Sequence, residues 1–166
     1  MNKLNLGVDI GRVLIDGDSA KSPDTNFLSG GIEQALRSPP VDGAIEGLAA
    51  LIETFGPASV WLVSKAGDRV ADKTRRWLDA REVYAKTGLV REQVVFVRER
   101  ADKARIARRH GLTHFIDDRV DVLGHLRGLV PHLFLFGEAA ERNDAPAWTS
   151  RCPTWAVAVE RVRAAL

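Results

Sequence analysis

The 166-residue sequence predicts one α/β domain, a three-layer α/β/α sandwich with about five parallel strands. Short apolar runs rich in Val, Ile, Leu and Phe, typical of buried strands, alternate along the chain with segments of helical periodicity. Acidic residues follow two of the apolar runs directly, and in open parallel sheets this end of the strands is where ligands bind. The length suits a single domain, expected over residues 1–166.

The first strand is expected at residues 4–10, and it delivers Asp9 to the carboxyl edge of the sheet. Residues 11–40 are rich in Gly and Pro and lack sustained periodicity. We expect a flap or minimal cap insertion there, with one small hairpin or helical turn, because a loop of this length in a compact domain is usually functional.

After the flap, helices and strands alternate to the end of the chain. In the first helix of this part, Ile45, Leu48, Ile52 and Phe55 share one face, and Asp42 is the expected N-cap. The expected helices span 42–55, 68–78, a further piece to about 86, 101–110 and 119–126, and a last one begins near Pro153 or Thr154. The expected strands span 59–63, 93–97, 113–116 and 132–136, and 137–150 is expected as a loop.

Composition narrows the classes of protein. The net charge is only +2, which disfavours nucleic acid as a partner. A single cysteine, Cys152, excludes an internal disulfide and favours a reducing compartment. The N-terminus lacks the pattern of a signal peptide, and no apolar run approaches the ~18 residues of a membrane span. We therefore expect a cytoplasmic protein without a membrane partner.

Three carboxylates are the strongest functional signal. Asp9 ends the first expected strand, and Asp117 and Asp118 end the fourth, with Asp121 one turn later. Carboxylates brought together at one sheet edge make a site for a hard cation such as Mg²⁺. Asp9 can instead cap a turn, Asp118 the next helix, and Asp121 can interact with the helix dipole. Such roles explain one acid but not all of them together.

Four short motifs in order resemble the haloacid dehalogenase superfamily: Asp9 after the first strand, Ser64 after the second, Lys103 on a basic helix, and Asp117-Asp118 after the fourth strand. The segment 116–121 is similar to the fourth motif of deoxyribonucleotidase-like members. The resemblance implies a Rossmann-like sheet of order 3-2-1-4-5 with a small cap or none.

The resemblance also implies roles for these residues. Asp9 would be the nucleophile that forms an aspartyl-phosphate, and it would ligate Mg²⁺ together with the carbonyl of Gly11, Asp117 and Asp118. Ser64 and Lys65 would bind the substrate phosphate, and Lys103 would hold its charge near Asp9. Three alternatives are open: Ser64 as a helix cap, Lys103 on a solvated face, and Lys65 or Lys73 in place of Lys103.

The first motif departs from the family pattern Asp-x-Asp, because it reads Asp9-Ile10-Gly11. The missing aspartate is the general acid/base of the family, whose help is typically worth about 10²–10⁴-fold in rate. Three hypotheses follow: a slow Mg²⁺-dependent phosphomonoesterase, an inactive relative that binds metal and a phosphorylated ligand or protein partner, and an enzyme with non-phosphatase chemistry.

Arg12 stands where a small residue is usual. It can bind a substrate phosphate as a bidentate donor or pair with Asp16 or Asp18 of the flap, and either of these acids can supply the missing proton. The expected substrate is a phosphorylated small molecule such as a nucleotide. A homo-oligomer is left open, with Trp148 or Trp155 either at its interface or in the core.

Overall fold

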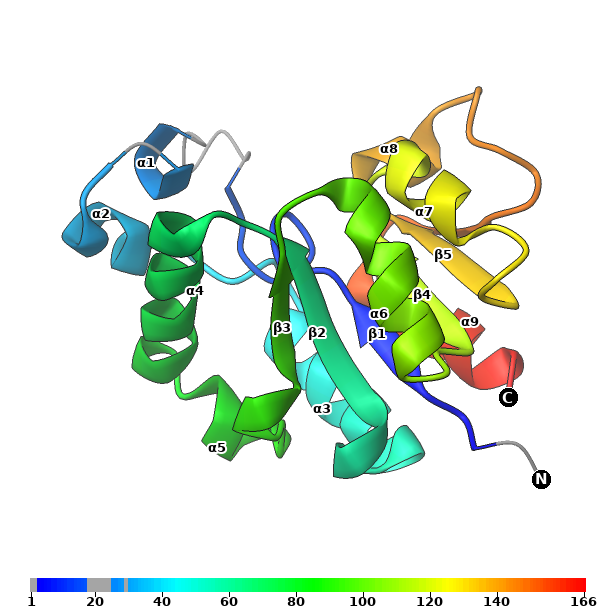
Figure 1. Ribbon diagram of the computed structural model, residues 1–166, viewed down its shortest axis with the longest axis horizontal. Coiled ribbons are helices and arrows are strands. Elements are labelled where there is room, and N and C mark those ends of the chain that lie inside the picture. The colour runs from blue at the N-terminus through cyan, green and yellow to red at the C-terminus, as the bar shows by residue number, and fades with distance from the viewer. Residues whose placement is uncertain (1–2, 18–24, 29) are drawn as a thin grey trace.

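The computed structural model describes residues 3–17, 25–28 and 30–166. Its centre is a six-stranded parallel sheet of order β3-β2-β1-β4-β5-β6 (Figure 1). The strands are β1 (Leu6–Val8), β2 (Val60–Lys65), β3 (Val94–Val97), β4 (His114–Asp117), β5 (His132–Phe136) and β6 (Ser150–Cys152). The predicted Rossmann-like α/β fold is confirmed, with one strand more than expected.

Helices cover both faces of the sheet and enclose two apolar cores. On one face pack α3 (Ala44–Phe55), α4 (Asp68–Ala80), α5 (Val83–Thr87) and α9 (Trp155–Ala164). On the other pack α6 (Lys103–Arg109), α7 (Val120–Leu126) and α8 (Glu138–Glu141). Short 3₁₀ turns span 57–59, 91–93 and 100–102. Figure 1 shows α6 in front of the sheet and α3 behind it.

Three local predictions were wrong. Helix α8 lies within the expected loop 137–150, and strand β6 begins at the last residue of that loop. Strand β6 has only three residues and no apolar run, and it forms because it pairs with β5. Strand β2 ends at Lys65, two residues beyond the expected end at 63, so Ser64 is its last residue but one. The N-cap of α3 is Gly43, with φ +77, instead of Asp42.

The centre of the sheet requires a glycine in β1. Gly7 pairs with Trp61 on one side and Phe115 on the other. A Cβ on Gly7 would lie 2.5 Å from the Phe115 ring, so any larger residue forces the ring to move. This close packing brings β1 and β4, which lead to the acidic residues, side by side.

The flap (residues 11–40) leaves the sheet edge through a tight turn. The amides of Val13, Leu14 and Ile15 all donate to the carbonyl of Ile10. The two ends of the flap then pair, because the Asp16 amide donates to Pro39 and the Val41 amide donates to Leu14. Two short helices, α1 (Thr25–Leu28) and α2 (Ile32–Arg37), lie against α4.

Trp155 closes the base of this turn. The side chain is buried, and its indole donates to the Val13 carbonyl at 2.7 Å. Gly47 of α3 makes room for the ring, since a Cβ there would lie 2.4 Å from it. Trp155 is therefore a core residue that fixes the chain leaving the acidic site. No helix in the described part of the chain is long and apolar enough to cross a membrane.

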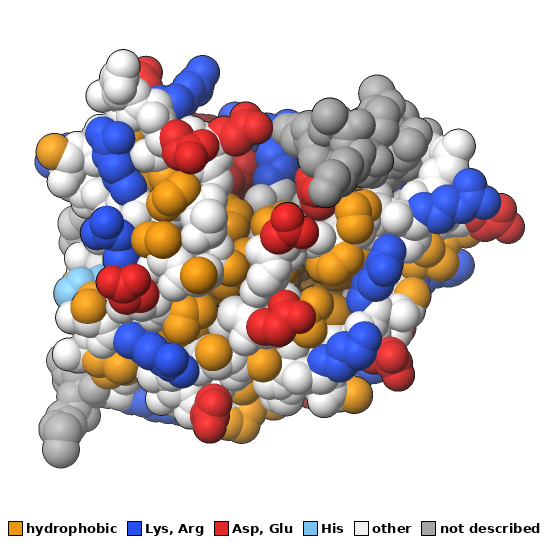
Figure 2. All heavy atoms as spheres, turned by 180° about the vertical axis from the view of Figure 1, so that it is seen from behind, with side chains coloured by type: hydrophobic (Ala, Val, Ile, Leu, Met, Phe, Trp, Pro, Cys, Tyr) orange, Lys and Arg blue, Asp and Glu red, His pale blue; other side chains and the backbone are white. Residues whose placement is uncertain are grey.

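Figure 2 shows the face of the molecule that points away from the viewer in Figure 1. On this face, acidic and basic side chains are interspersed among exposed hydrophobic atoms.

Candidate functional site

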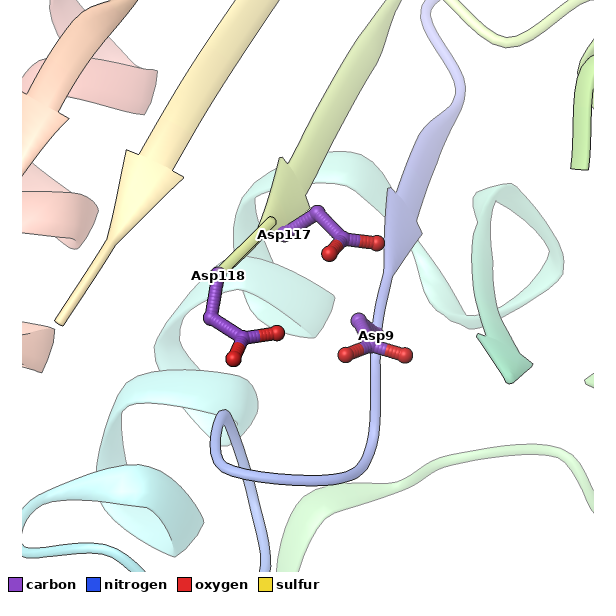
Figure 3. A group of neighbouring side chains, drawn as sticks. All are labelled: Asp9, Asp117 and Asp118. Atoms are coloured by element: carbon purple, nitrogen blue, oxygen red, sulfur yellow. The ribbon is translucent and has the colours of Figure 1, made fainter. Parts of the chain in front are cut away.

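Three carboxylates meet at the carboxyl ends of β1 and β4. Asp9 follows β1, Asp117 ends β4 and Asp118 comes next, and their carboxylates face a common space (Figure 3). One ligand oxygen from each lies within 4.8 Å of the others. The Asp9 amide donates to the Ile116 carbonyl at 3.0 Å, which fixes the two strand ends relative to each other. The parallel register thus brings together acids that are far apart in sequence.

Lys103 joins the cluster from the first turn of α6. Its side chain is only 3% exposed, and its Nζ donates to Asp9 Oδ1 and Asp117 Oδ2, both at 2.8 Å. Of the two rivals, Lys65 is exposed and lines the cavity beside the acids. Lys73 points elsewhere, because its Nζ donates to backbone carbonyls of the flap. The structure therefore places Lys103, and neither rival, between the carboxylates.

The cluster holds more negative than positive charge. Burial lowers the pKa of Lys103, but the charges of Asp9 and Asp117 outweigh it and raise that pKa, so the ammonium stays protonated. Burial and the neighbouring Asp9 charge raise the pKa of Asp117 well above its usual value and raise that of Asp118 to about 7. With three carboxylates and one buried ammonium, the cluster has an excess of negative charge, which a divalent cation would neutralise.

The donor set fits a hard metal ion. Carboxylate oxygens are the ligands that Mg²⁺ prefers, and Asp9, Asp117 and Asp118 offer one each. Gly11 lines the same cavity and needs no side chain to offer its backbone carbonyl. Asp117 also accepts a hydrogen bond from the Arg119 amide at 3.0 Å through its other oxygen, which orients the carboxylate.

A cavity of about 240 Å³ opens from the acids. Ser64, at the end of β2, lines it and is half-buried. Cations surround the acidic floor: Arg12, Lys65, Arg100, Lys103 and Arg119. The flap and α4 add apolar residues to the lining: Phe27, Leu28 and Val70. A second cavity of about 850 Å³ adjoins the first and shares Arg12, Asp118 and Arg119 with it.

Arg12 sits in a strained backbone conformation beside the acids. Its φ of +63° lies in the left-handed region, which costs a non-glycine residue about 1–2 kcal/mol. Its positive charge opposes the rise in the pKa of Asp118. Asp16 lines the second cavity together with Arg12, whereas Asp18, the other acid considered for this role, lies outside the described residues.

Gly11 has free space around it. It is exposed, and a Cβ built on it would meet no atom within 4 Å. Its φ lies outside the left-handed region, so neither space nor backbone conformation demands a glycine here. The position at which the resemblance implies a second aspartate therefore has room for one but carries no side chain.

One of the alternative roles for the acids was wrong, and one was confirmed: Asp121 lies in the first turn of α7, where a carboxylate interacts favourably with the helix dipole. The N-cap of α7 is Arg119, without a side-chain cap, so Asp118 does not cap this helix. Asp121 pairs with Arg119 at 3.1 Å and with Arg100 at 3.7 Å, and thereby anchors two cations at the mouth of the cavity.

Sequence reasoning missed Arg100 and Arg119 as parts of the site. Arg119 directly follows the paired acids, and Arg100 lies three residues before Lys103, so a search around each motif would have found both. It also missed the contribution of the flap residues Phe27 and Leu28 to the cavity, for which the sequence holds no signal.

Comparison of structures identifies relatives of this fold. A haloacid dehalogenase-like family hydrolase from Xanthomonas campestris aligns with a TM-score of 0.63 at 13% identity, over 99% of this chain and 96% of that one. A putative haloacid dehalogenase-like hydrolase from Burkholderia xenovorans aligns with a TM-score of 0.64 at 12% identity, over 96% of each chain. No protein-family model matches the sequence, and no curated protein matches it. At these identities the likeness establishes a shared fold.

Proposed function

We propose that the chain is a Mg²⁺-dependent phosphomonoesterase that transfers the phosphoryl group to Asp9, and that Gly11 makes it slow. One observation carries the proposal: a buried ammonium, Lys103, is held at 2.8 Å from both Asp9 and Asp117 at the floor of a cavity lined with cations. A structural ion pair needs neither the third acid nor the open cavity. The shared fold with haloacid dehalogenase-like hydrolases also supports the proposal.

In the first step, an Asp9 oxygen attacks phosphorus and the bond from phosphorus to the ester oxygen breaks. The ester oxygen leaves with the electron pair of that bond as an alkoxide or phenoxide, which takes a proton from solvent water, and an aspartyl-phosphate remains. In the second step, water attacks this phosphorus and inorganic phosphate departs, which restores the Asp9 carboxylate. Ser64 donates a hydrogen bond to a phosphate oxygen, while Lys103 and Lys65 neutralise the charge on the others.

Mg²⁺, held by Asp9, Asp117, Asp118 and the Gly11 carbonyl, would neutralise charge on the phosphoryl oxygens. Lys103 orients the Asp9 carboxylate through its hydrogen bond, so that the other oxygen can face the phosphorus. The Arg119 amide keeps Asp117 in place.

Gly11 makes both steps of the proposed reaction slow. With no acid at this position, the leaving alcohol departs without a proton from it, and the water of the second step lacks the family's base. Two consequences follow. Esters of acidic alcohols, such as nitrophenol, should react much faster than esters of alkanols. The aspartyl-phosphate should also accumulate, because its hydrolysis is slowed.

The test is to mix the protein with Mg²⁺ and a nitrophenyl phosphate and to measure its mass under acidic quench. We expect a mass gain of one phosphoryl group on the peptide that contains Asp9, together with release of nitrophenol. Asp9→Asn should show neither. Ser59→Ala is a matched control, since this buried residue lies at the opposite end of β2 from the site. Folded wild-type protein that neither gains a phosphoryl group nor releases nitrophenol would contradict the proposal.

The competing hypothesis, an inactive protein that binds metal and a phosphorylated ligand, gives a different result. Mg²⁺ and a phosphonate would then bind and raise the melting temperature, yet Asp9 would never be phosphorylated. One observation favours this second candidate: an acidic side chain would fit at Gly11, because a Cβ there meets no atom within 4 Å, and yet the position has none.

A further inference from the structure

We propose that the flap and helix α4 build a binding site for the alcohol part of the substrate, and that this substrate is a small phosphomonoester with an apolar, aromatic-sized alcohol. Lys73 is the residue that positions this site. The inference rests on the proposed function, because it assigns the transferred phosphate to the acidic floor of the same cavity.

The cavity has two chemically distinct sides. Around Asp9 it is lined by charged groups, whereas the side formed by the flap and α4 presents Phe27, Leu28 and Val70. Ile15, from the turn after the acids, extends this apolar wall. Phe27 is 6% exposed, but Leu28 is 52% exposed, although large apolar side chains are usually buried. A substrate bound against Leu28 would cover it.

Size and charge limit the substrate. The cavity of about 240 Å³ lies below the roughly 300–1,000 Å³ usual for sites that enclose larger ligands. The space beside the apolar wall therefore holds a phosphate and one further group of about the size of a ring, while the larger adjoining cavity is lined mainly by charged residues. The cations lie on the phosphate side of the cavity. The apolar wall offers few hydrogen-bond partners for a sugar, because the hydroxyl of its polar residue, Thr74, already donates to the Val70 carbonyl. The sugar of a nucleotide would find few hydrogen-bond partners on this wall.

Lys73 holds the apolar wall in place. Its side chain is 4% exposed, and its Nζ donates to the carbonyls of Phe27 at 3.0 Å and Leu28 at 3.3 Å, and also to that of Gly30. A buried ammonium is costly unless its hydrogen bonds are satisfied, and here the end of α1 satisfies them. The contacts are to backbone carbonyls, so Lys73 fixes where Phe27 and Leu28 lie without entering the cavity itself.

The same face of α4 continues the contact with the flap. At intervals of four residues, Arg69 donates to Gly30, Trp77 to Ser38, and Arg81 to Leu36 and Ser38. These donors hold different parts of the flap: Lys73 holds α1, which carries the wall, whereas Arg81 holds the end of α2, which does not line the cavity. Arg81 is therefore a matched control for Lys73.

The test measures binding rather than turnover, because leaving-group acidity would otherwise mix with recognition. Full-length protein with Mg²⁺ is titrated calorimetrically with phenylphosphonate, methylphosphonate and adenosine 5′-monophosphate. We expect phenylphosphonate to bind at least about tenfold more tightly than methylphosphonate, since even one added methylene in an apolar pocket is worth about that factor. Adenosine 5′-monophosphate should bind more weakly than phenylphosphonate.

One variant and its control test whether the apolar wall causes the preference for phenylphosphonate. Phe27→Ala should bring the ratio of the two phosphonate affinities close to one and leave methylphosphonate affinity unchanged. Phe55→Ala is its control, because Phe55 packs edge-on against His114 at the far end of α3; it should keep the wild-type ratio.

The outcomes separate the two proposals. Equal binding of both phosphonates, or tighter binding of adenosine 5′-monophosphate, would overturn the apolar site while the phosphate site stands. Failure of all three ligands to bind would overturn both proposals.

For Lys73, we expect Lys73→Met to lose the preference for phenylphosphonate while methylphosphonate binds as before, and Lys73→Arg to restore part of the preference. Arg81→Met should keep it. A merely structural role would weaken both phosphonates alike in Lys73→Met, or change the ratio equally in Arg81→Met, and either result would overturn the role of Lys73.

Discussion

Gly11→Asp tests directly whether the site lacks only its acid. Since a Cβ at Gly11 would meet no atom within 4 Å and its backbone is not left-handed, an aspartate can be added without displacing a neighbour. Its backbone carbonyl stays available as a ligand. The new carboxyl group would stand two residues after Asp9, at the edge of the cavity that already holds Lys103 and Asp118.

The expected gain follows from the role of the acid. General acid/base catalysis contributes about 10²–10⁴-fold, which corresponds to about 3–5 kcal/mol of activation free energy. We expect Gly11→Asp to raise kcat by this factor for alkyl phosphates, and by less for nitrophenyl phosphate, whose leaving group needs no proton. Rates measured over a series of phosphate esters with Mg²⁺ should depend less steeply on leaving-group pKa in the variant. The aspartyl-phosphate should no longer accumulate.

Gly11→Asn is the matched control, with the same size but no proton to give. It should keep the wild-type rate and the steep dependence on the leaving group. If Gly11→Asp folds and binds Mg²⁺ yet gains no more than Gly11→Asn, the reasoning that the site lacks only its acid is wrong.

Three further predictions concern stability. Asp118→Asn should raise the free energy of unfolding of metal-free protein at pH 8 by up to about 4 kcal/mol, because burial and the Asp9 charge raise the pKa of this carboxyl from 3.8 to about 7; a denaturant titration that finds a loss would contradict this. Burial lowers the pKa of His114 in the fold, so the unfolded chain takes up the proton first, and stability should fall as pH drops below about 6.5. His114→Gln should lessen that fall between pH 7.5 and 5.5. Gly7→Ala should lower the free energy of unfolding by about 1–3 kcal/mol, since its Cβ would overlap the Phe115 ring; an unchanged melting temperature would refute this packing argument.

The layered fold was predictable because its signals are local. The run 133–136 is apolar, and β5 has the expected bounds. In α4, Thr74, Trp77 and Leu78 are buried and Val70 packs against the core, as their spacing indicates. Strand β6 was not predictable, because Ser150, Arg151 and Cys152 have no strand pattern of their own. Its pairing with β5 depends on a neighbour that only the folded sheet provides.

The acidic site was predictable for a different reason. Parallel strands bring their carboxyl ends to one edge, so acids that follow separate strands must converge there. The apolar wall was not predictable, since it depends on where the flap comes to rest. The donors Arg69, Lys73, Trp77 and Arg81 recur every fourth residue and so share one helix face, but their acceptors are backbone carbonyls, which sequence does not distinguish.

The positions of Lys103 and Gly11 bear on whether the protein turns over substrate. Burying Lys103 between two carboxylates is costly for a protein that needs only a stable core, because ion pairs in such places are often no better than apolar packing. Asp118, with its raised pKa, adds to that cost unless a cation binds. A protein that had lost all use of the site would gain stability by replacing these charges. The charged groups to which the proposed function assigns metal and phosphate are all present, and only the group that would move the proton is absent. This pattern fits a site that still binds a phosphorylated ligand and reacts slowly with esters whose leaving group needs no proton.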